Sequence, residues 1–197
     1  ASQTISLTVI AVNDAPTLAV PAAQTVAEDT NLAFSAAGGN AITVGDVDAG
    51  ASPVQLTLSV SSGTLTLSGT TGLTFTTGTG TGDATMTFSG TLANVNTALN
   101  GLVYRGALNF NGADTLSLLV DDLGNTGSGG PLTASQTVVL TVTAVNDAPT
   151  LAVPGAQTVA EDTTLVLSAA GGNAISVGDV DAASGPVQLT LSVGSGT

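Results

Sequence analysis

Apolar and small polar residues alternate along most of this chain, with Thr and Val especially frequent. A period of two residues is typical of half-buried antiparallel strands, in which one face packs on a core and the other meets water. The alternation is clearest in residues 55–60, 64–68, 73–77, 84–89, 115–120 and 135–145. Gly, Ser, Asn and Asp separate these segments, as hairpin turns require. The pattern predicts an all-β fold, an Ig-like antiparallel β-sandwich.

Residues 91–102 depart from this alternation because their apolar side chains recur at helical spacing. These side chains are Leu92, Val95, Leu99 and Leu102. Gly101 is well placed to end the helix, since glycine readily adopts the backbone conformation that follows a helix. The sequence therefore predicts one short helix in a crossover of the sandwich.

The same pattern returns after 133 residues, with Asn146 in the place of Asn13. Residues 1–64 overlay residues 134–197 without a gap and agree at 52 of 64 positions. A fixed long period is typical of a tandem array of one domain. We therefore expect residues 13–145 to form one complete β-sandwich repeat. Residues 1–12 would be the last strand of an upstream repeat, and residues 146–197 the first part of the next.

The charge of the chain is strongly unbalanced. Fourteen acids face a single cation, Arg105, and the formal net charge is −13. Such a surface repels nucleic acid and anionic lipid and attracts cations. The chain has no apolar run of about 18 residues, so no segment is expected to insert into a membrane, and no signal peptide is visible. The lack of cysteine excludes disulfides and thiolate metal sites.

Twelve of the fourteen acids occur in short phrases at predicted turns, and only Asp83 and Asp114 stand apart. The phrases are Asn13-Asp14, Asn146-Asp147, Glu28-Asp29, Glu161-Asp162, Asp46-Val47-Asp48, Asp179-Val180-Asp181 and Asp121-Asp122. Neighbouring carboxylates repel by about 1 kcal/mol in water and by several times more when partly buried. One arginine cannot neutralise them all. Each phrase alone is also a good turn former, so a role in turns without any metal is the alternative.

Strand directions in a sandwich bring these phrases together at its two ends. One end is expected to gather Asn13, Asp14, Asp46, Asp48, Asp121 and Asp122. The other is expected to gather Glu28, Asp29, Asn146, Asp147, Asp179 and Asp181, from two consecutive domains and the linker between them. Oxygen ligands without His or Cys select Ca²⁺, which takes 6–8 of them at roughly 2.3–2.6 Å. The sequence therefore predicts calcium sites at the junctions between repeats.

Five phrases follow one another along the chain: VNDAPT after a long last strand, AEDT, DVDA, NFNGADTLSLLVDD and NTGSGG. In this order they resemble the cadherin-like tandem domains of giant bacterial surface proteins, of which the repeats-in-toxin adhesins are the best known. The linker between cadherin domains reads Asp-x-Asn-Asp-Asn-x-Pro, and residues 13–16 and 146–149 match its core. Its first Asp is replaced by Ala11 and Ala144, and its second Asn by Ala15 and Ala148.

The resemblance implies specific roles. Glu28 would correspond to the glutamate of the first strand, Asp46 and Asp48 to the Asp-x-Asp pair, and Asp121 or Asp122 to the late aspartate before the last hairpin. It also implies an extracellular array on the bacterial cell surface, exported by a dedicated secretion system, in which neighbouring repeats are the partners and a distant tip is adhesive. Calcium-filled junctions would stiffen such a stalk for attachment or biofilm formation.

Two other classes of function compete with this structural one. The first is a carbohydrate- or surface-binding β-sandwich module, but sugar sites usually offer exposed aromatic side chains, and this chain has four Phe, one Tyr and no Trp. The second is a hydrolase that uses paired carboxylates as acid and base. No His, Lys, Cys or nucleophilic Ser motif accompanies the acid pairs. We therefore expect a structural module, with carbohydrate or surface binding as the alternative, and no enzymatic activity.

Overall fold

The computed structural model describes residues 2–125 and 127–194. The predicted segments 1–12 and 146–197 therefore lie partly outside the described residues, at residue 1 and at residues 195–197. The chain divides into two compact units, Ala1–Ala144 (unit 1) and Val145–Thr197 (unit 2). This division falls one residue before the predicted repeat boundary, which follows Val145.

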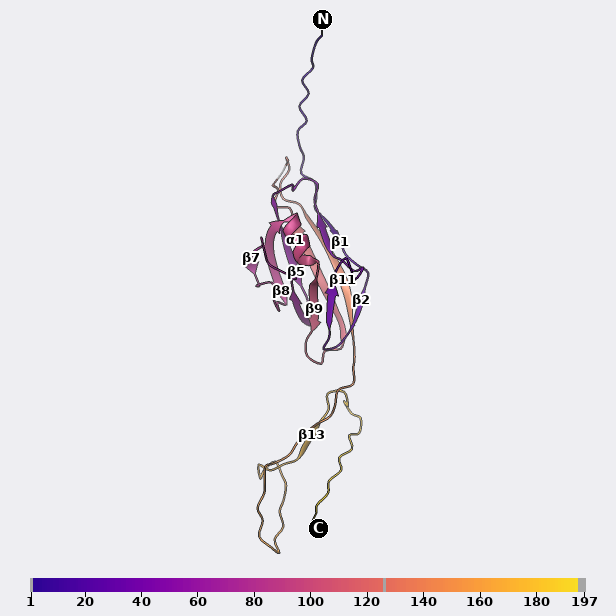
Figure 1. Cartoon of the computed structure of the whole chain (residues 1–197), viewed down its shortest axis with the longest axis vertical. Helices are drawn as coiled ribbons and strands as arrows, with labels where there is room; N and C mark the ends of the chain where they lie inside the picture. Colours follow the sequence, from indigo (N-terminus) through magenta and orange to yellow (C-terminus); the bar gives the residue numbers. More distant parts are fainter. Residues whose placement is uncertain (1, 126, 195–197) are drawn as a thin grey trace. The chain divides into compact units, whose positions relative to one another are not determined.

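Unit 1 is an all-β sandwich with one short helix, as the alternation predicts (Figure 1). Its larger sheet contains, in order across the sheet, β2 (Gln24–Ala27), β11 (Thr133–Thr143), β10 (Gly112–Asp121), β5 (Pro53–Ser59), β8 (Thr85–Thr91) and β7 (Thr74–Thr77). The smaller sheet contains β3 (Asn31–Phe34), β9 (Leu102–Gly106) and β6 (Gly63–Thr66). A separate ribbon pairs β1 (Thr17–Ala19) with β4 (Thr43–Gly45). Neighbouring strands are antiparallel except β2, which runs parallel to β11.

The core explains the alternation in the sequence. Each of the six alternating segments contains a strand, and the observed bounds differ from the predicted ones by at most three residues. In β5, for example, Val54, Leu56 and Leu58 are fully buried, whereas the residues between them are half-buried. Both sheets contribute to the core, with Phe34, Leu65, Phe88, Tyr104, Leu116 and Leu140 among its members. Burying one large apolar side chain stabilises a fold by about 1.5–3 kcal/mol.

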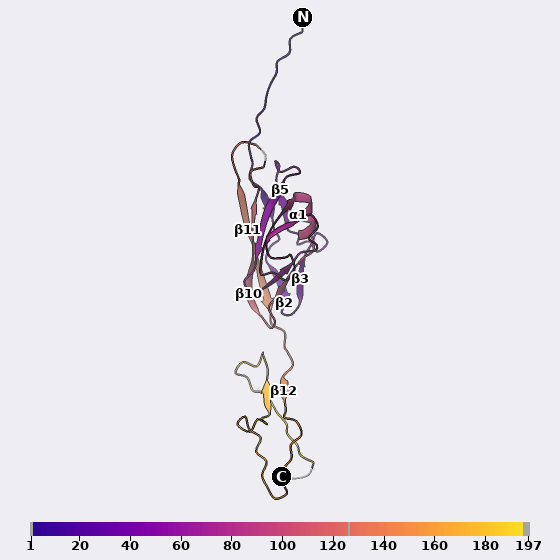
Figure 2. The same ribbon diagram turned by 90° about the vertical axis from the view of Figure 1, so that its left-hand side faces the viewer.

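The predicted helix is α1 (Leu92–Leu99), which connects β8 of the larger sheet to β9 of the smaller one. The Thr91 hydroxyl accepts a hydrogen bond from the Asn94 N–H at 3.3 Å and caps the first turn. Gly101 has a φ of +110°, a conformation that favours glycine. Leu102 shares the helical spacing but follows Gly101, and it begins β9 and is fully buried, because the chain turns at Gly101 into the smaller sheet. Figure 2 shows α1 and β3 on one side of unit 1 and β10 and β11 on the other.

A buried carboxylate joins separate parts of the sandwich. Asp114 of β10 is only 4% exposed and accepts hydrogen bonds from the N–H groups of Ser61 and Ser62 at 3.0 Å each. The Thr115 N–H donates another at 2.8 Å, and the Tyr104 hydroxyl of β9 donates a fourth at 3.0 Å. Both oxygens are thereby satisfied. This acid, which stands outside the acidic phrases of the sequence, holds the turn before β6 against both sheets.

Ionisation of Tyr104 is expected to coincide with unfolding at alkaline pH. Burial of the ring, and then the hydrogen bond to Asp114 and its negative charge, raise the pKa of Tyr104 well above its ordinary value of 10.0. The unfolded chain loses this proton near that pH and the folded chain keeps it, so stability that is present below pH 10.0 falls as the pH rises further. Tyr104 is the only tyrosine and there is no tryptophan, so tyrosinate absorbance reads this group alone. Absorbance that rises while the circular dichroism of the sheets stays constant would contradict the prediction.

Unit 2 contains two short strands, β12 (Thr150–Ala152) and β13 (Ser176–Gly178), which pair in antiparallel fashion (Figure 2 labels β12). They are the only strands among the residues of unit 2 that the structure describes. Their register matches that of β1 with β4 at an offset of 133 residues. Across both units, no helix in the described part of the chain has the length and apolar character needed to cross a membrane.

Candidate metal centre

Hydrogen bonds tie two consecutive linker residues to two acidic pairs at one end of unit 1, which we call the acidic end. It comprises Asn13, Asp14, Asp46, Asp48, Asp121 and Asp122. The side-chain amide of Asn13 donates to Asp122 Oδ2 at 2.6 Å, and the backbone N–H of Asp14 donates to Asp48 Oδ2 at 2.6 Å. Asn13 thus contacts one acidic pair and Asp14 contacts the other. Within unit 1 as described, however, no three carboxylates place an oxygen each within 4.8 Å of one another, so the pairs are neighbouring groups rather than one cluster.

The turn after β4 is built by Asp46. Its Oδ1 accepts hydrogen bonds from the N–H groups of Asp48 at 2.7 Å and Ala49 at 2.9 Å. This is the side-chain turn that the sequence offers as the alternative to a metal site. Both of these hydrogen bonds use Oδ1, so the turn leaves the Oδ2 of Asp46 without a role in it.

The second oxygen of Asp46 is an exception to the usual satisfaction of buried polar groups. Oδ2 is buried and has no hydrogen-bond partner among the described residues. A buried acceptor without a partner costs about 1–3 kcal/mol, and more when it is charged. A bound cation would remove this cost. The donor set fits Ca²⁺, since it consists of carboxylate, amide and backbone oxygens and the chain contains no His or Cys.

Asp121 and Asp122 form the turn after β10. Asp121 Oδ1 accepts a hydrogen bond from the Leu123 N–H at 2.7 Å. Asp122 is 3% exposed, and its Oδ1 accepts from the N–H groups of Gly124 and Leu132 at 2.8 Å each. Burial by itself would raise the pKa of Asp122, but these two bonds and the one from the linker amide hold the pKa below its ordinary value. Asp122 therefore stays ionised and ties the linker to the domain.

A glycine-rich loop, residues 127–130, holds the linker through hydrogen bonds, and we call this contact the clasp. The N–H of Asn13 donates to the Ser128 carbonyl at 3.0 Å, and the N–H of Ser128 donates to the Ala11 carbonyl at 2.9 Å. The Asn13 amide also donates to the Gly130 carbonyl at 3.0 Å. A Cβ on Gly127 would lie 2.6 Å from the Asn13 nitrogen, so only glycine permits this approach. In the sequence, the only sign of this clasp is the cluster of glycines.

The substitution Gly127→Ala is expected to open the clasp. The residue has a φ of +90° and faces the linker backbone, so strain and the clash together should cost about 1–3 kcal/mol. Amide hydrogen exchange at Asn13 and Ser128 should accelerate at least tenfold, while exchange in β10 stays slow. Gly82→Ala is the matched control, because Gly82 has a φ of +67° but a Cβ added there would meet no atom within 4 Å. Equal exchange in the two variants at Asn13 would show that the clasp does not hold the linker.

Glu28 and Asp29 lie at the opposite end of unit 1, because β2 runs parallel to β11 and ends beside Thr143. Glu28 is 3% exposed, and its N–H donates to the Thr143 carbonyl at 2.9 Å. Its Oε2 accepts a bond from the Asn111 amide at 3.4 Å. Asp29 adopts a φ of +58° and accepts a hydrogen bond from the Asn109 N–H at 3.2 Å. The predicted metal-binding roles of Glu28 and Asp29 stay predictions.

Unit 2 repeats the local geometry of the first copy. The N–H of Asp147 donates to Asp181 Oδ2, as that of Asp14 does to Asp48. Asp179 Oδ1 accepts bonds from the N–H groups of Asp181 at 2.9 Å and Ala182 at 3.0 Å, as Asp46 does in unit 1. A hollow of about 370 Å³ beside this turn is lined partly by Asn146, Asp179 and Asp181. The same contacts therefore form in two sequence copies that differ elsewhere.

Comparison with protein-family models gives no match for this chain, and comparisons with curated proteins and with solved structures give none either.

Proposed function

We propose that this protein is a calcium-stabilised extender module of a long bacterial cell-surface adhesin. In this role it lies outside the cell and joins neighbouring repeats of the same chain into a stalk. The stalk projects an adhesive tip for attachment or biofilm formation. The tandem period of 133 residues, the acidic phrases at turns and their resemblance to cadherin-like repeats support this proposal.

The observation that carries the proposal is the buried Oδ2 of Asp46, which has no hydrogen-bond partner among the described residues. The residues that would hold Ca²⁺ in unit 1 are Asp46 and Asp48 with Asp14 of the linker, and unit 2 offers Asp179, Asp181 and Asp147 in the same arrangement. The ion would supply positive charge and satisfy this oxygen. Asp122 would act differently, because hydrogen bonds already occupy both of its oxygens.

The linker contacts explain how such an ion could stiffen an array. Asp14 and Asp147 each donate their backbone N–H to the second Asp of the following Asp-Val-Asp turn. An ion bound at this turn would therefore restrain the linker as well as the domain. Pro16 and Pro149 restrict the backbone just beyond it. The metal then limits the freedom of one repeat relative to the next.

Small-angle X-ray scattering of a chain with two complete repeats tests this function. Its maximum dimension is expected to lengthen and become better defined on addition of Ca²⁺, and calorimetric titration gives the number of ions. Asp147→Asn should abolish the change, because it keeps the backbone N–H that contacts Asp181 but removes the linker carboxylate that would bind the ion. Asp83→Asn is the control, since Asp83 Oδ2 accepts three N–H bonds within its own loop, from Thr79, Gly80 and Thr81. Scattering that does not respond to Ca²⁺ would refute the extender function.

A further inference from the structure

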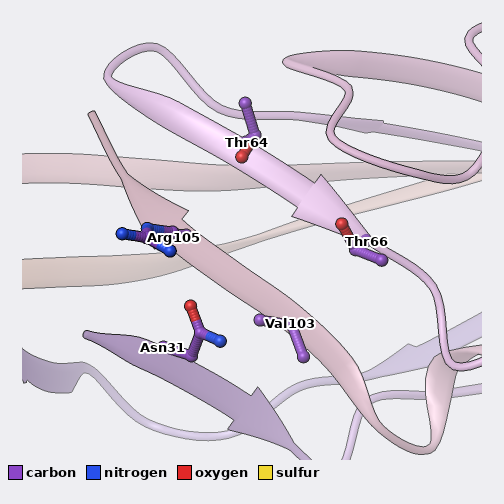
Figure 3. A pocket seen from close by; sticks show the side chains of 5 residues that line it. All are labelled: Asn31, Thr64, Thr66, Val103 and Arg105. Carbon is purple, nitrogen blue, oxygen red and sulfur yellow. The ribbon is translucent and has the colours of Figure 1, made fainter. Parts of the chain in front are cut away.

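The only cation of the chain lines a hollow on the outer face of the smaller sheet (Figure 3). The hollow has a volume of about 290 Å³ and is lined by Asn31, Thr64, Thr66, Val103 and Arg105. Arg105 lies on the central strand β9, directly between Asn31 of β3 and Thr64 of β6 in the strand register. Three strands that are distant in sequence thus place one guanidinium group among neutral polar side chains.

Arg105 is not used by the fold as an ion-pair partner. Its side chain is exposed, and no carboxylate among the described residues lies within 4.0 Å of it, although the chain has fourteen acids. The planar group and its five N–H donors therefore face solvent at the edge of the hollow.

The chemistry of the hollow defines its ligand. A guanidinium group binds a carboxylate through two parallel hydrogen bonds, and one guanidinium matches one carboxylate. Thr64, Thr66 and Asn31 can both donate to and accept from hydroxyl groups. The volume is at the lower limit of small-molecule sites, which suits a single ring. No aromatic side chain lines the hollow, so it offers no stacking surface to a neutral sugar.

We propose that this hollow binds one carboxylated sugar, a uronic acid that carries a single negative charge. The carboxylate pairs with Arg105, and the ring hydroxyls contact Thr64, Thr66 and Asn31. The acidic side chains of a second copy are the less suitable occupant, because two chains that each carry a net charge of −13 repel each other far more than one chain repels a singly charged uronate. The site is independent of the extender function, since it uses strands β3, β6 and β9 and none of the residues of the acidic end.

Titration of the whole isotope-labelled chain with glucuronate, followed by NMR, tests the proposal. Glucuronate is expected to shift the backbone amides of Thr64 and Thr66 and the side-chain signal of Arg105. Glucose, which has the ring hydroxyls without the carboxylate, and acetate, which has the carboxylate alone, should each bind at least tenfold more weakly. The titration is carried out once in chelator and once in Ca²⁺, because a bound ion could bridge the uronate to the acidic phrases instead. Shifts that occur only with Ca²⁺ and only at Asp46 and Asp48 would overturn the proposal.

Variants on the exposed sheet face separate binding from folding. Arg105→Ala should weaken glucuronate binding about tenfold or more, since a hydrogen bond to a charged group contributes about that much. Arg105→Lys should recover only part of the affinity, because lysine keeps the charge but not the paired donors. Thr64→Val should weaken binding, whereas Thr137→Val on the exposed face of β11 is the matched control and should not. Binding unchanged in Arg105→Ala would refute the site. A dimer that Arg105→Ala dissociates, detected by sedimentation, would show that the face binds a second copy instead.

Discussion

In millimolar Ca²⁺ the chain is expected to melt about 5–10 °C higher than in chelator. An ion that binds only the folded state adds about 2.7 kcal/mol to the free energy of unfolding when its concentration is a hundredfold above the dissociation constant. We expect this stabilisation to come from the Oδ2 of Asp46, which is buried without a partner among the described residues, and from relief of the repulsion between neighbouring acids. Thermal melts followed by circular dichroism measure the difference. Coincident melts in the two buffers would contradict calcium binding.

The effect of Asp46→Asn on the free energy of unfolding should differ between chelator and Ca²⁺. The amide keeps the Oδ1 acceptor that builds the turn, and it removes the charge from the buried position. In chelator the variant is therefore expected to be at least as stable as the original chain, because an unpaired buried carboxylate is costly. In Ca²⁺ it should lose most of the gain. Asp83→Asn serves as the control and should lower stability equally with and without Ca²⁺, because the carboxylate of Asp83 only closes its own loop.

Asp114→Asn is expected to destabilise unit 1 by about 3 kcal/mol, whatever the calcium concentration. The amide nitrogen would replace an acceptor with a donor, so some of the four groups that now donate to Asp114 would be buried without a partner. Tyr104→Phe removes only one of these bonds and should cost about 1 kcal/mol. Urea unfolding with an unchanged slope measures both values.

The double variant, Asp114→Asn with Tyr104→Phe, shows whether the two side chains act as one hydrogen-bonded pair or independently. Removing the Tyr104 hydroxyl relieves part of the mismatch that the substituted amide creates, so the two costs should sum to more than the cost of the double variant. Strict additivity would show that the Tyr104 hydroxyl and the Asp114 carboxylate do not act as a pair. A loss of stability in Asp114→Asn that appears only in chelator would show instead that Asp114 takes part in calcium binding.

Strand positions were predictable because burial on one face of a sheet imposes a period of two on the sequence. Val54, Leu56 and Leu58 illustrate this, and the strand bounds moved by at most three residues. Leu102 shows where such a pattern stops being informative. Its spacing fits both the end of a helix and the start of a buried strand, and only the turn at Gly101 decides between them.

The candidate site was predicted only in part, because a sequence pattern shows where acids fall along the chain but not which groups they meet after folding. The acidic phrases and their period are properties of the chain, and the expected directions of the strands placed six of the predicted ligands at one end. The roles within that end were not predictable, because they depend on which backbone N–H groups meet each carboxylate. Asp122 uses both oxygens in hydrogen bonds, two of them from Asn13 and Leu132, whereas one buried oxygen of Asp46 has no partner in the part of the chain that the structure describes.

Local pattern and period were enough to establish the all-β class, the repeat and the placing of acids at turns. Other features exist only once the chain is folded. Folding brings the glycines of residues 127–130 against the linker more than a hundred residues earlier in the chain, and it places Asp114 under the turn at Ser61. It also sets Arg105 between Asn31 and Thr64. These pairings depend on strand order and register, which are set by how the two sheets pack around one core and not by any short stretch of residues.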